Sequence, residues 1–424
     1  MAGSSAKPLF AALVIFLYLP FAWQYGWLLL PGGTVDYPSY HYAAVMAFEE
    51  GKTPYGPAAF DEATAELGGK VHPFLYPPPT LLALWPLAKL SFSAGKTALI
   101  LASHLSYLWA IWLLLTRLTP LPADGRLRDL TIVVSLVYLF LFDPAIVTLG
   151  IGQINLIVLP FLFLALAAMR RNAAAWQIAL PLSLAILLKT YPVLLFLPLL
   201  FRKQFKAIAL TCVFFWIYTA IAALVLPADV WSTWLRFVVP NGGYTANIVA
   251  AGAPWNQNIN AFVCRLFLEN ERSQTLFPYP PLAKPLATLM ALAVAALTAF
   301  FAFRAARRSP DRAVGDCEIA AFLLMIFLIA PLSWEHHLVY ILPATIIAIK
   351  MLVANELRWR EALLVAAALF LTGWRVPFWD PALSRGWWTL LISIKFYAAV
   401  VLWIFFLNRL RALPPTVANL PATR

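Results

Sequence analysis

The sequence predicts an all-α polytopic membrane protein with about 12 transmembrane helices and its candidate site on the outer face. Two observations lead to this fold class. Of 424 residues, 62% are hydrophobic and only 12% are charged, and the mean hydropathy is +0.79. Soluble globular chains carry roughly a quarter charged residues. In addition, long apolar runs recur along most of the chain, so most of it is expected to lie in lipid.

Each predicted span is an apolar run close to the roughly 20 residues that cross a bilayer. The first run is longer than a signal-peptide core and lacks a small-residue cleavage site, so we interpret it as an uncleaved first helix. Residues 77–90 are apolar but short and rich in proline, which favours a re-entrant or interfacial helix. The predicted spans lie near residues 9–30, 97–116, 130–148, 152–169, 174–188, 191–205, 207–226, 284–303, 317–332, 337–353, 362–374 and 387–407.

The segment 174–205 is predicted to be a hairpin of two short helices. A single span would place Arg170-Arg171 and Arg202-Lys203 on opposite sides of the membrane. A turn at Tyr191-Pro192 keeps both basic clusters on one side, and the residue before a proline is disfavoured in a helix. The hairpin therefore agrees better with the distribution of charge.

The basic residues gather in short loops between apolar runs, which indicates cytoplasmic loops. This bias places residues 31–96, 227–283, 333–336 and 375–386 outside, and the N-terminus in the cytoplasm. The net charge of +12 is therefore attributed to membrane topology, and nucleic acid is not an expected partner. The predicted location is the inner (plasma) membrane.

The domain organisation is predicted to be simple. Residues 1–412 form one integral domain, and residues 413–424 form a disordered cytoplasmic tail. Cys212, Cys264 and Cys317 are widely spaced, which argues against a disulfide framework.

Asp36 stands alone just after the first apolar run and is the candidate catalytic residue. A capping role for the helix that follows is one interpretation, because Asp often precedes a helix. The other is a general base that takes a proton from a hydroxyl group, which needs hydrogen-bond reach and a site that excludes bulk water. The two roles are compatible.

Residues 333–337 read Ser-Trp-Glu-His-His at a predicted membrane boundary. His336 and His337 can donate hydrogen bonds to an anion, and Trp334 offers a flat face to a sugar ring. We predict donor phosphate or sugar binding for these three residues and Glu335. Metal binding ranks second, because adjacent side chains on a helix point in different directions, and a purely structural role ranks third.

Lys189 lies within a predicted span, where a charge is expensive and usually functional. We predict that it contacts a lipid phosphate, and a snorkelling lysine at a hairpin tip is the alternative. Further polar side chains suited to sugar hydroxyls are the carboxamides at two outer turns, for which a turn-forming role is the alternative. These carboxamides are Gln153, Asn155, Asn256, Gln257 and Asn258.

The motifs, taken in order, resemble glycosyltransferase family 87, which includes polyprenol-phosphate-mannose-dependent α-mannosyltransferases. The series runs along nearly the whole chain: Asp36 with Tyr40, Gly51-x3-Tyr55, Tyr76-Pro77-Pro78 with Pro86, Gly152-Gln153-x-Asn155, Leu188-Lys189-x-Tyr191-Pro192, Asn256-Gln257-Asn258 and Pro331 to His337. Glu335 stands where family members often carry Asp, and Asn258 where Ser is common.

The resemblance implies a glycosyltransferase C-type fold and a polyprenyl-phosphate sugar as donor. Asp36 then matches the catalytic base. Lys189, His336 and His337 are expected to contact the donor, and we call the two histidines the His pair. Tyr40 and Tyr76 join the carboxamides as expected contacts of the acceptor or sugar. The implied reaction moves a hexose, with mannose expected, to an envelope glycolipid or glycan with inversion. Neither a cofactor nor a divalent metal is expected.

Two other classes remain open from the sequence. One is a lipid or polysaccharide transporter or flippase, in which charges would line a path through the membrane. The absence of a visible inverted repeat argues against it. The other is a non-catalytic membrane scaffold that binds a protein partner.

Overall fold

The computed structural model describes residues 6–26, 34–67, 71–119, 121–240, 251–270, 272–308, 313–378 and 380–412. Within these ranges every regular element is helical, apart from two isolated β-bridges. The predicted all-α class is therefore confirmed for the described part of the chain. The last residues of the first predicted span (27–30) and the predicted tail (413–424) lie outside it.

In the described ranges, 6 helical segments are long and apolar enough to cross a membrane. They are α5 (Phe92–Leu113) with η2 (Leu114–Leu118), α6 (Gly125–Phe140) with α7 (Asp143–Gly150), α11 (Phe205–Val225), α14 (Pro280–Arg308), η4 (Glu335–Ile341) with α16 (Leu342–Val353), and η6 (Gly386–Ser393) with α18 (Ile394–Ala412).

The remaining predicted spans correspond to six other helical segments, and all but the first, which has 21 residues, are shorter than 18 residues. They are α1 (Ala6–Gly26), α8 (Asn155–Arg170), α9 (Ala175–Leu188), η3 (Tyr191–Leu195) with α10 (Phe196–Phe201), α15 (Asp316–Ile329) and α17 (Trp359–Gly373). A 14-residue helix such as α9 is only about 21 Å long. The prediction of about 12 transmembrane helices is therefore confirmed only in part.

The predicted hairpin is confirmed by contacts at its base. Arg170 pairs with Asp316 at 2.5 Å, and Arg202 pairs with Glu318 two residues further along α15. Gln204 also donates to the side chain of Asn172 at 2.7 Å. Both basic clusters therefore lie at one end of the bundle, which we call the arginine end.

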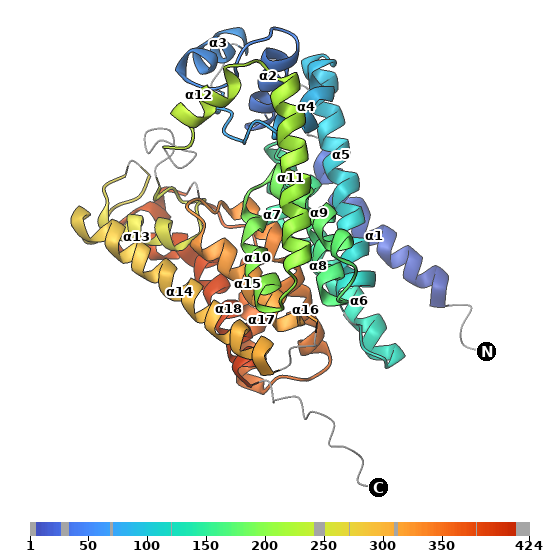
Figure 1. Ribbon diagram of the computed structural model, residues 1–424. Helices are drawn as coiled ribbons and strands as arrows, with labels where there is room; N and C mark the ends of the chain where they lie inside the picture. The colour runs from blue at the N-terminus through green and yellow to red at the C-terminus, as the bar shows by residue number, and fades with distance from the viewer. Residues whose placement is uncertain are drawn as a thin grey trace.

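Lys189 lies at the other end of α9, together with a layer of short helices, and we call this the α2 end. The layer contains α2 (Tyr37–Phe48), α3 (Pro57–Leu67), α4 (Thr80–Ala88) and α12 (Val230–Phe237), as the top of Figure 1 shows. These helices share a second, smaller hydrophobic core. The proline-rich segment expected to be re-entrant forms α4, which is only 9 residues long.

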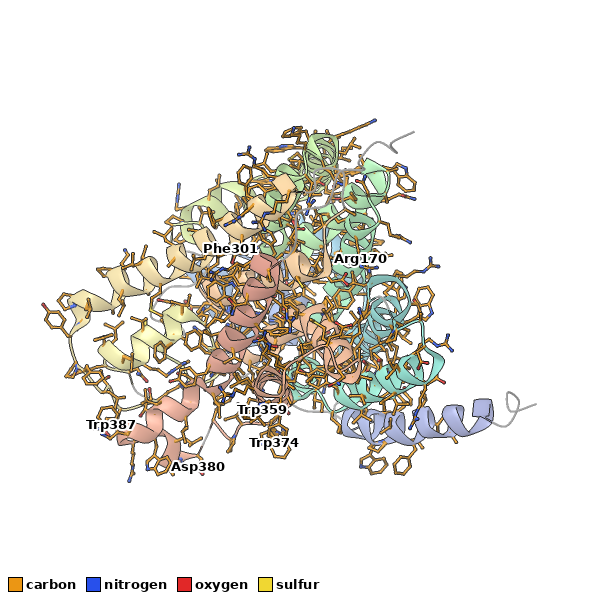
Figure 2. The ribbon with its side chains drawn as sticks, turned by 90° about the horizontal axis from the view of Figure 1, so that it is seen from below. Arg170, Phe301, Trp359, Trp374, Asp380 and Trp387 are labelled. Carbon is orange, nitrogen blue, oxygen red and sulfur yellow. The ribbon has the colours of Figure 1, made fainter. Side chains whose placement is uncertain are left out.

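Helices at the periphery expose apolar side chains. α11 and α14 run along the outside of the bundle in Figure 1. Only 11% of the most apolar 18-residue stretch of α11 is buried, and only 17% of that of α14. In the view from below, Trp374 and Trp387 lie on the rim of the structure (Figure 2), where 57% and 68% of their surface is exposed. This is the distribution expected where lipid, rather than water, covers the surface.

The interior is formed by α8, α15 and α16, with α17 and α18 beside them. α13 (Ile259–Phe267) and η5 (Pro381–Ser384) complete the described elements. Each of α8, α15 and η4 with α16 has one terminus at the α2 end. The chain thus delivers residues near 36, 76, 153, 189 and 336 to the same end of the bundle.

Candidate active site

Asp36 is the residue before α2, but its side chain makes no capping hydrogen bond. Its carboxylate turns away from the helix. Oδ1 lies 3.0 Å from Nδ1 of His72, and Oδ2 accepts a hydrogen bond from Nε2 of Gln153 at 2.9 Å. The backbone N–H of Asp36 donates to the carbonyl of Ile151 at 2.8 Å, which fixes the residue against the turn before α8. The side chain of Asp36 therefore binds His72 and Gln153 and does not cap α2.

Gln153 joins Asp36 to two tyrosines. Its Oε1 accepts hydrogen bonds from the hydroxyls of Tyr40 at 2.6 Å and Tyr76 at 3.1 Å, and from the backbone N–H of Ile154. Because these donors occupy the carbonyl oxygen, the amide nitrogen must point to Asp36. The sequence motifs at 36–40, 76 and 153 are thus parts of one hydrogen-bonded network.

Gly152 allows this turn to form. Its φ of +71° is unfavourable for residues with a side chain, and an added Cβ would lie 2.9 Å from Cβ of Tyr37 and 3.1 Å from Cβ of Thr34. The turn therefore requires glycine directly before Gln153.

We expect Gly152→Ala to lower the free energy of unfolding by about 1–3 kcal/mol and to displace Gln153 from Asp36. Thermal unfolding in detergent measures the first effect. Gly150→Ala is the matched control, because no atom lies within 4 Å of a Cβ at that position. Equal unfolding midpoints for the two variants would contradict the requirement for glycine.

The surroundings of Asp36 keep it ionised. Burial by itself raises the pKa of this carboxyl, but the hydrogen bond from His72, the nearby imidazoles of His336 and His72, and the Gln153 amide outweigh it. The pKa of Asp36 therefore lies below its ordinary value of 3.8. A mostly buried carboxylate that stays charged at neutral pH is able to accept a proton.

Lys189 and the His pair complete this group of residues. The ammonium of Lys189 lies 4.8 Å from the centre of the Tyr76 ring and within electrostatic range of Asp36 and His336. The rings of His336 and His337 are 4.6 Å apart. Lys189 thus brings positive charge to the region between Asp36 and the His pair.

Trp334 and Glu335 point to different neighbours. Trp334 stacks with Trp255, with ring centres 5.8 Å apart, and also with His336, with ring centres 6.2 Å apart. Glu335 faces Lys395 of α18 at 3.3 Å. The structure therefore keeps Trp334 near the His pair and directs Glu335 into a separate group of charges.

That group, which we call the α18 charge cluster, consists of Asp143, Glu335, Arg375 and Lys395. Lys395 is 0% exposed and also lies 3.8 Å from Asp143, whose other oxygen is 3.6 Å from Arg375. The cluster joins α7, η4 and α18 beside the His pair. A lysine within an apolar run, such as Lys395, is a sequence signal for a functional or paired charge. The sequence does not identify its partners, because Asp143 and Glu335 are far from it along the chain.

The carboxamides at 256–258 serve the backbone. Asn256 accepts from the N–H of Ser333 and donates to Ala251. Gln257 donates to the carbonyls of Pro254 and Ile392 and accepts from the N–H of Phe396, whereas Asn258 caps α13 and donates to Ala330. All three side chains are 0% exposed. This arrangement fastens the 251–258 loop to residues 330–334.

Asn155 has a similar position in the interior. It is 0% exposed, and its Oδ1 accepts a hydrogen bond from the hydroxyl of Tyr340 at 3.0 Å. The side chain therefore joins α8 to η4 beneath the site. Of the predicted acceptor or sugar-binding residues, only Tyr40, Tyr76 and Gln153 belong to the network around Asp36.

His72 is the site residue that sequence reasoning missed. It lies in the loop before α4, outside every motif, and a single histidine in a polar loop gives no periodic or spacing signal. Among the described residues, no group of three or more His, Cys, Asp or Glu side chains is arranged to hold a metal ion.

The fold and this site are those of a multi-pass membrane protein. Its reactive polar side chains converge at one end of a helical bundle. The model of glycosyltransferase family 87 matches residues 74–331, which is more than half of the chain. The chain therefore belongs to this family and is a membrane glycosyltransferase. Residues 333–337 lie directly after the matched range, and Asp36 lies before it.

The chain is also similar to characterised mycobacterial proteins. It is 25% identical over 340 residues to a Polyprenol-phosphate-mannose-dependent alpha-(1-2)-phosphatidylinositol mannoside mannosyltransferase of Mycobacterium tuberculosis, covering 76% of this chain and 73% of the relative. The protein of the same description from Mycolicibacterium smegmatis is 29% identical over 318 residues, covering 72% and 68%. A pentamannoside mannosyltransferase of that organism is 24% identical over 346 residues, covering 79% and 77%.

Proposed function

We propose that this enzyme transfers a hexose, with mannose expected, from a polyprenyl-phosphate sugar to an envelope glycolipid or glycan. The observation that carries the proposal is the ionised, mostly buried carboxylate of Asp36 next to the positive charge of Lys189. A base and a cation that influence each other electrostatically within one site suit the two ends of a glycosyl transfer. The names of the relatives support the choice of donor and the glycolipid class of acceptor.

Asp36 acts as the general base in this proposal. Its carboxylate removes the proton from an acceptor hydroxyl while the hydroxyl oxygen bonds to the anomeric carbon of the donor. The bond between that carbon and the phosphate oxygen breaks, and the phosphate leaves with the electron pair. Because attack and departure occur on opposite faces in a single step, the anomeric configuration inverts.

Lys189 and the His pair stabilise the departing phosphate. The leaving group develops negative charge, and a fixed cation in a site that excludes water lowers the energy of that charge. The ammonium of Lys189 is held over the Tyr76 ring, so it is positioned before the donor arrives. Trp334, which stacks with Trp255 and with His336, contributes an aromatic surface for the donor sugar in this proposal.

The α2 end faces the extracytoplasmic side of the inner membrane in this proposal, with the N-terminus in the cytoplasm. The arginine end gathers Arg170, Arg171, Arg202 and Lys203, as a cytoplasmic surface should. The exposed apolar surface of α11 and α14 suits a lipid-linked donor that stays in the bilayer. No second function is favoured by the geometry.

The test is a choice between donors. We expect the purified full chain in liposomes to transfer label from radiolabelled polyprenyl-phosphate mannose to lipids of a membrane extract. A nucleotide-linked mannose at the same concentration should give no transfer. Transfer from the nucleotide sugar, with none from the lipid-linked sugar, would overturn the proposal.

A further inference from the structure

Residues 71–79, which directly precede α4, cross the site and contribute two residues to it. Phe74, in the middle, is 1% exposed and its N–H donates to the hydroxyl of Tyr42 at 2.9 Å. The carbonyl of Tyr76 accepts a hydrogen bond from the hydroxyl of Tyr55 at 2.7 Å. These anchors hold His72 and Tyr76 at fixed places on either side of Phe74.

His72 and Gln153 hold the two oxygens of Asp36 from different elements. Nδ1 of His72 is 3.0 Å from Oδ1, and Nε2 of Gln153 is 2.9 Å from Oδ2. An ionised carboxylate has acceptors only, so the ring nitrogen that faces it must carry the proton and donate. Nδ1 donates this hydrogen bond both in the neutral Nδ1–H tautomer and in the imidazolium, in which both nitrogens are protonated.

We propose that His72 is a positioning residue for the catalytic base: its Nδ1–H, together with the side-chain amide of Gln153, fixes the orientation of the Asp36 carboxylate. This inference rests on the proposed role of Asp36. With one donor on each oxygen, rotation of the carboxylate about its Cβ–Cγ bond would break both hydrogen bonds. Each oxygen keeps a lone pair, so Asp36 can still accept a proton from a hydroxyl.

The exposure of His72 fits a positioning role better than a role in packing the interior. Its side chain is 28% exposed, whereas that of Asp36 is 14% exposed, so the imidazole is the more exposed partner of this contact. The other titratable groups that face Asp36 are Tyr40, Tyr76, Lys189 and His336.

Loss of the hydrogen bond from His72 should change the pKa of Asp36. The hydrogen bond from His72 is a leading cause that lowers the pKa of Asp36, so its removal should raise that pKa. A base with a raised pKa becomes protonated at higher pH as the pH falls. The acid limb of the rate profile should therefore move to higher pH in a variant without this donor.

Two variants separate positioning from structure. His72→Phe keeps a ring of similar size but removes the donor, and His72→Asn places an amide N–H near the position of Nδ1. We expect His72→Phe to lower kcat by about 10²-fold with little change in the KM for the donor. We expect His72→Asn to recover most of that loss. His104→Phe, which removes a histidine hydrogen-bonded to Tyr18 in α1, is the matched control.

A measurement without turnover makes the inference independent of the reaction. A water-soluble carbodiimide labels protonated carboxyl groups, and peptide mass spectrometry gives the pH midpoint of labelling at Asp36. We expect the midpoint to rise by about one pH unit in His72→Phe relative to the wild type and to His104→Phe.

Three results would overturn the inference: an unchanged labelling midpoint, a wild-type kcat in His72→Phe, or a His72→Asn variant as slow as His72→Phe. If the midpoint rises but the wild type transfers no sugar, the proposed function fails and the contact between His72 and Asp36 stands.

Discussion

Replacing Asp36 with asparagine is expected to reduce the rate of sugar transfer by about 10²- to 10⁴-fold, the usual contribution of a general base. Asparagine has nearly the same shape, but its amide cannot accept the proton of the acceptor hydroxyl. The oxygen of the new amide can still accept one of the hydrogen bonds that now come from His72 and Gln153. The loss of the other should lower stability by only about 1 kcal/mol.

Initial rates with saturating lipid-linked donor measure this effect, and thermal unfolding in detergent confirms that the variant is folded. Asp61→Asn is the matched control, since Asp61 is an exposed residue of α3 and undergoes the same chemical change. Its rate should equal that of the wild type. A folded Asp36→Asn variant with wild-type activity would exclude Asp36 as the base and direct attention to Glu335.

Replacing Lys395 with methionine is expected to lower the free energy of unfolding by about 3–5 kcal/mol. Lys395 lies between Glu335 at 3.3 Å and Asp143 at 3.8 Å and has no exposed surface. Its removal leaves two buried carboxylates near each other, with only the side chain of Arg375, 80% exposed, close to Asp143. An uncompensated buried charge is the main source of the loss.

Unfolding in detergent with a chemical denaturant measures this loss. Lys350→Met provides a control with the same change at a partly exposed lysine in the last turn of α16. Adding Glu335→Gln to Lys395→Met should restore part of the stability, because one unpaired carboxylate is then removed. Equal stability of Lys395→Met and Lys350→Met would contradict the role of the α18 charge cluster.

The fold could be predicted to the level of class and local topology. Arg170 and Arg202 led to the hairpin, because the energy of placing charge across a membrane restricts topology strongly. The number of full crossings could not be predicted as well. Hydropathy does not distinguish a short interior helix such as α9 from a complete span, since both are apolar along their length.

The site could be predicted where a residue is unusual for its surroundings. Asp36, Lys189 and Gln153 are polar groups beside apolar runs, and the structure brings them together with Tyr40 and Tyr76. His72 escaped prediction because its role depends on where one loop crosses α2. The contacts of the carboxamides at 256–258 could not be predicted for a related reason: composition shows that they can form hydrogen bonds, but not that backbone groups use them.

The most direct test of the account is the anomeric configuration of the product. Purified wild-type protein is supplied with polyprenyl-phosphate mannose of a single known anomer, and nuclear magnetic resonance determines the configuration of the new glycosidic bond. Single displacement with Asp36 as the base predicts the opposite configuration in the product. Retention of the donor configuration would contradict it, because Asp36 would then act as a nucleophile or a different residue would carry the reaction.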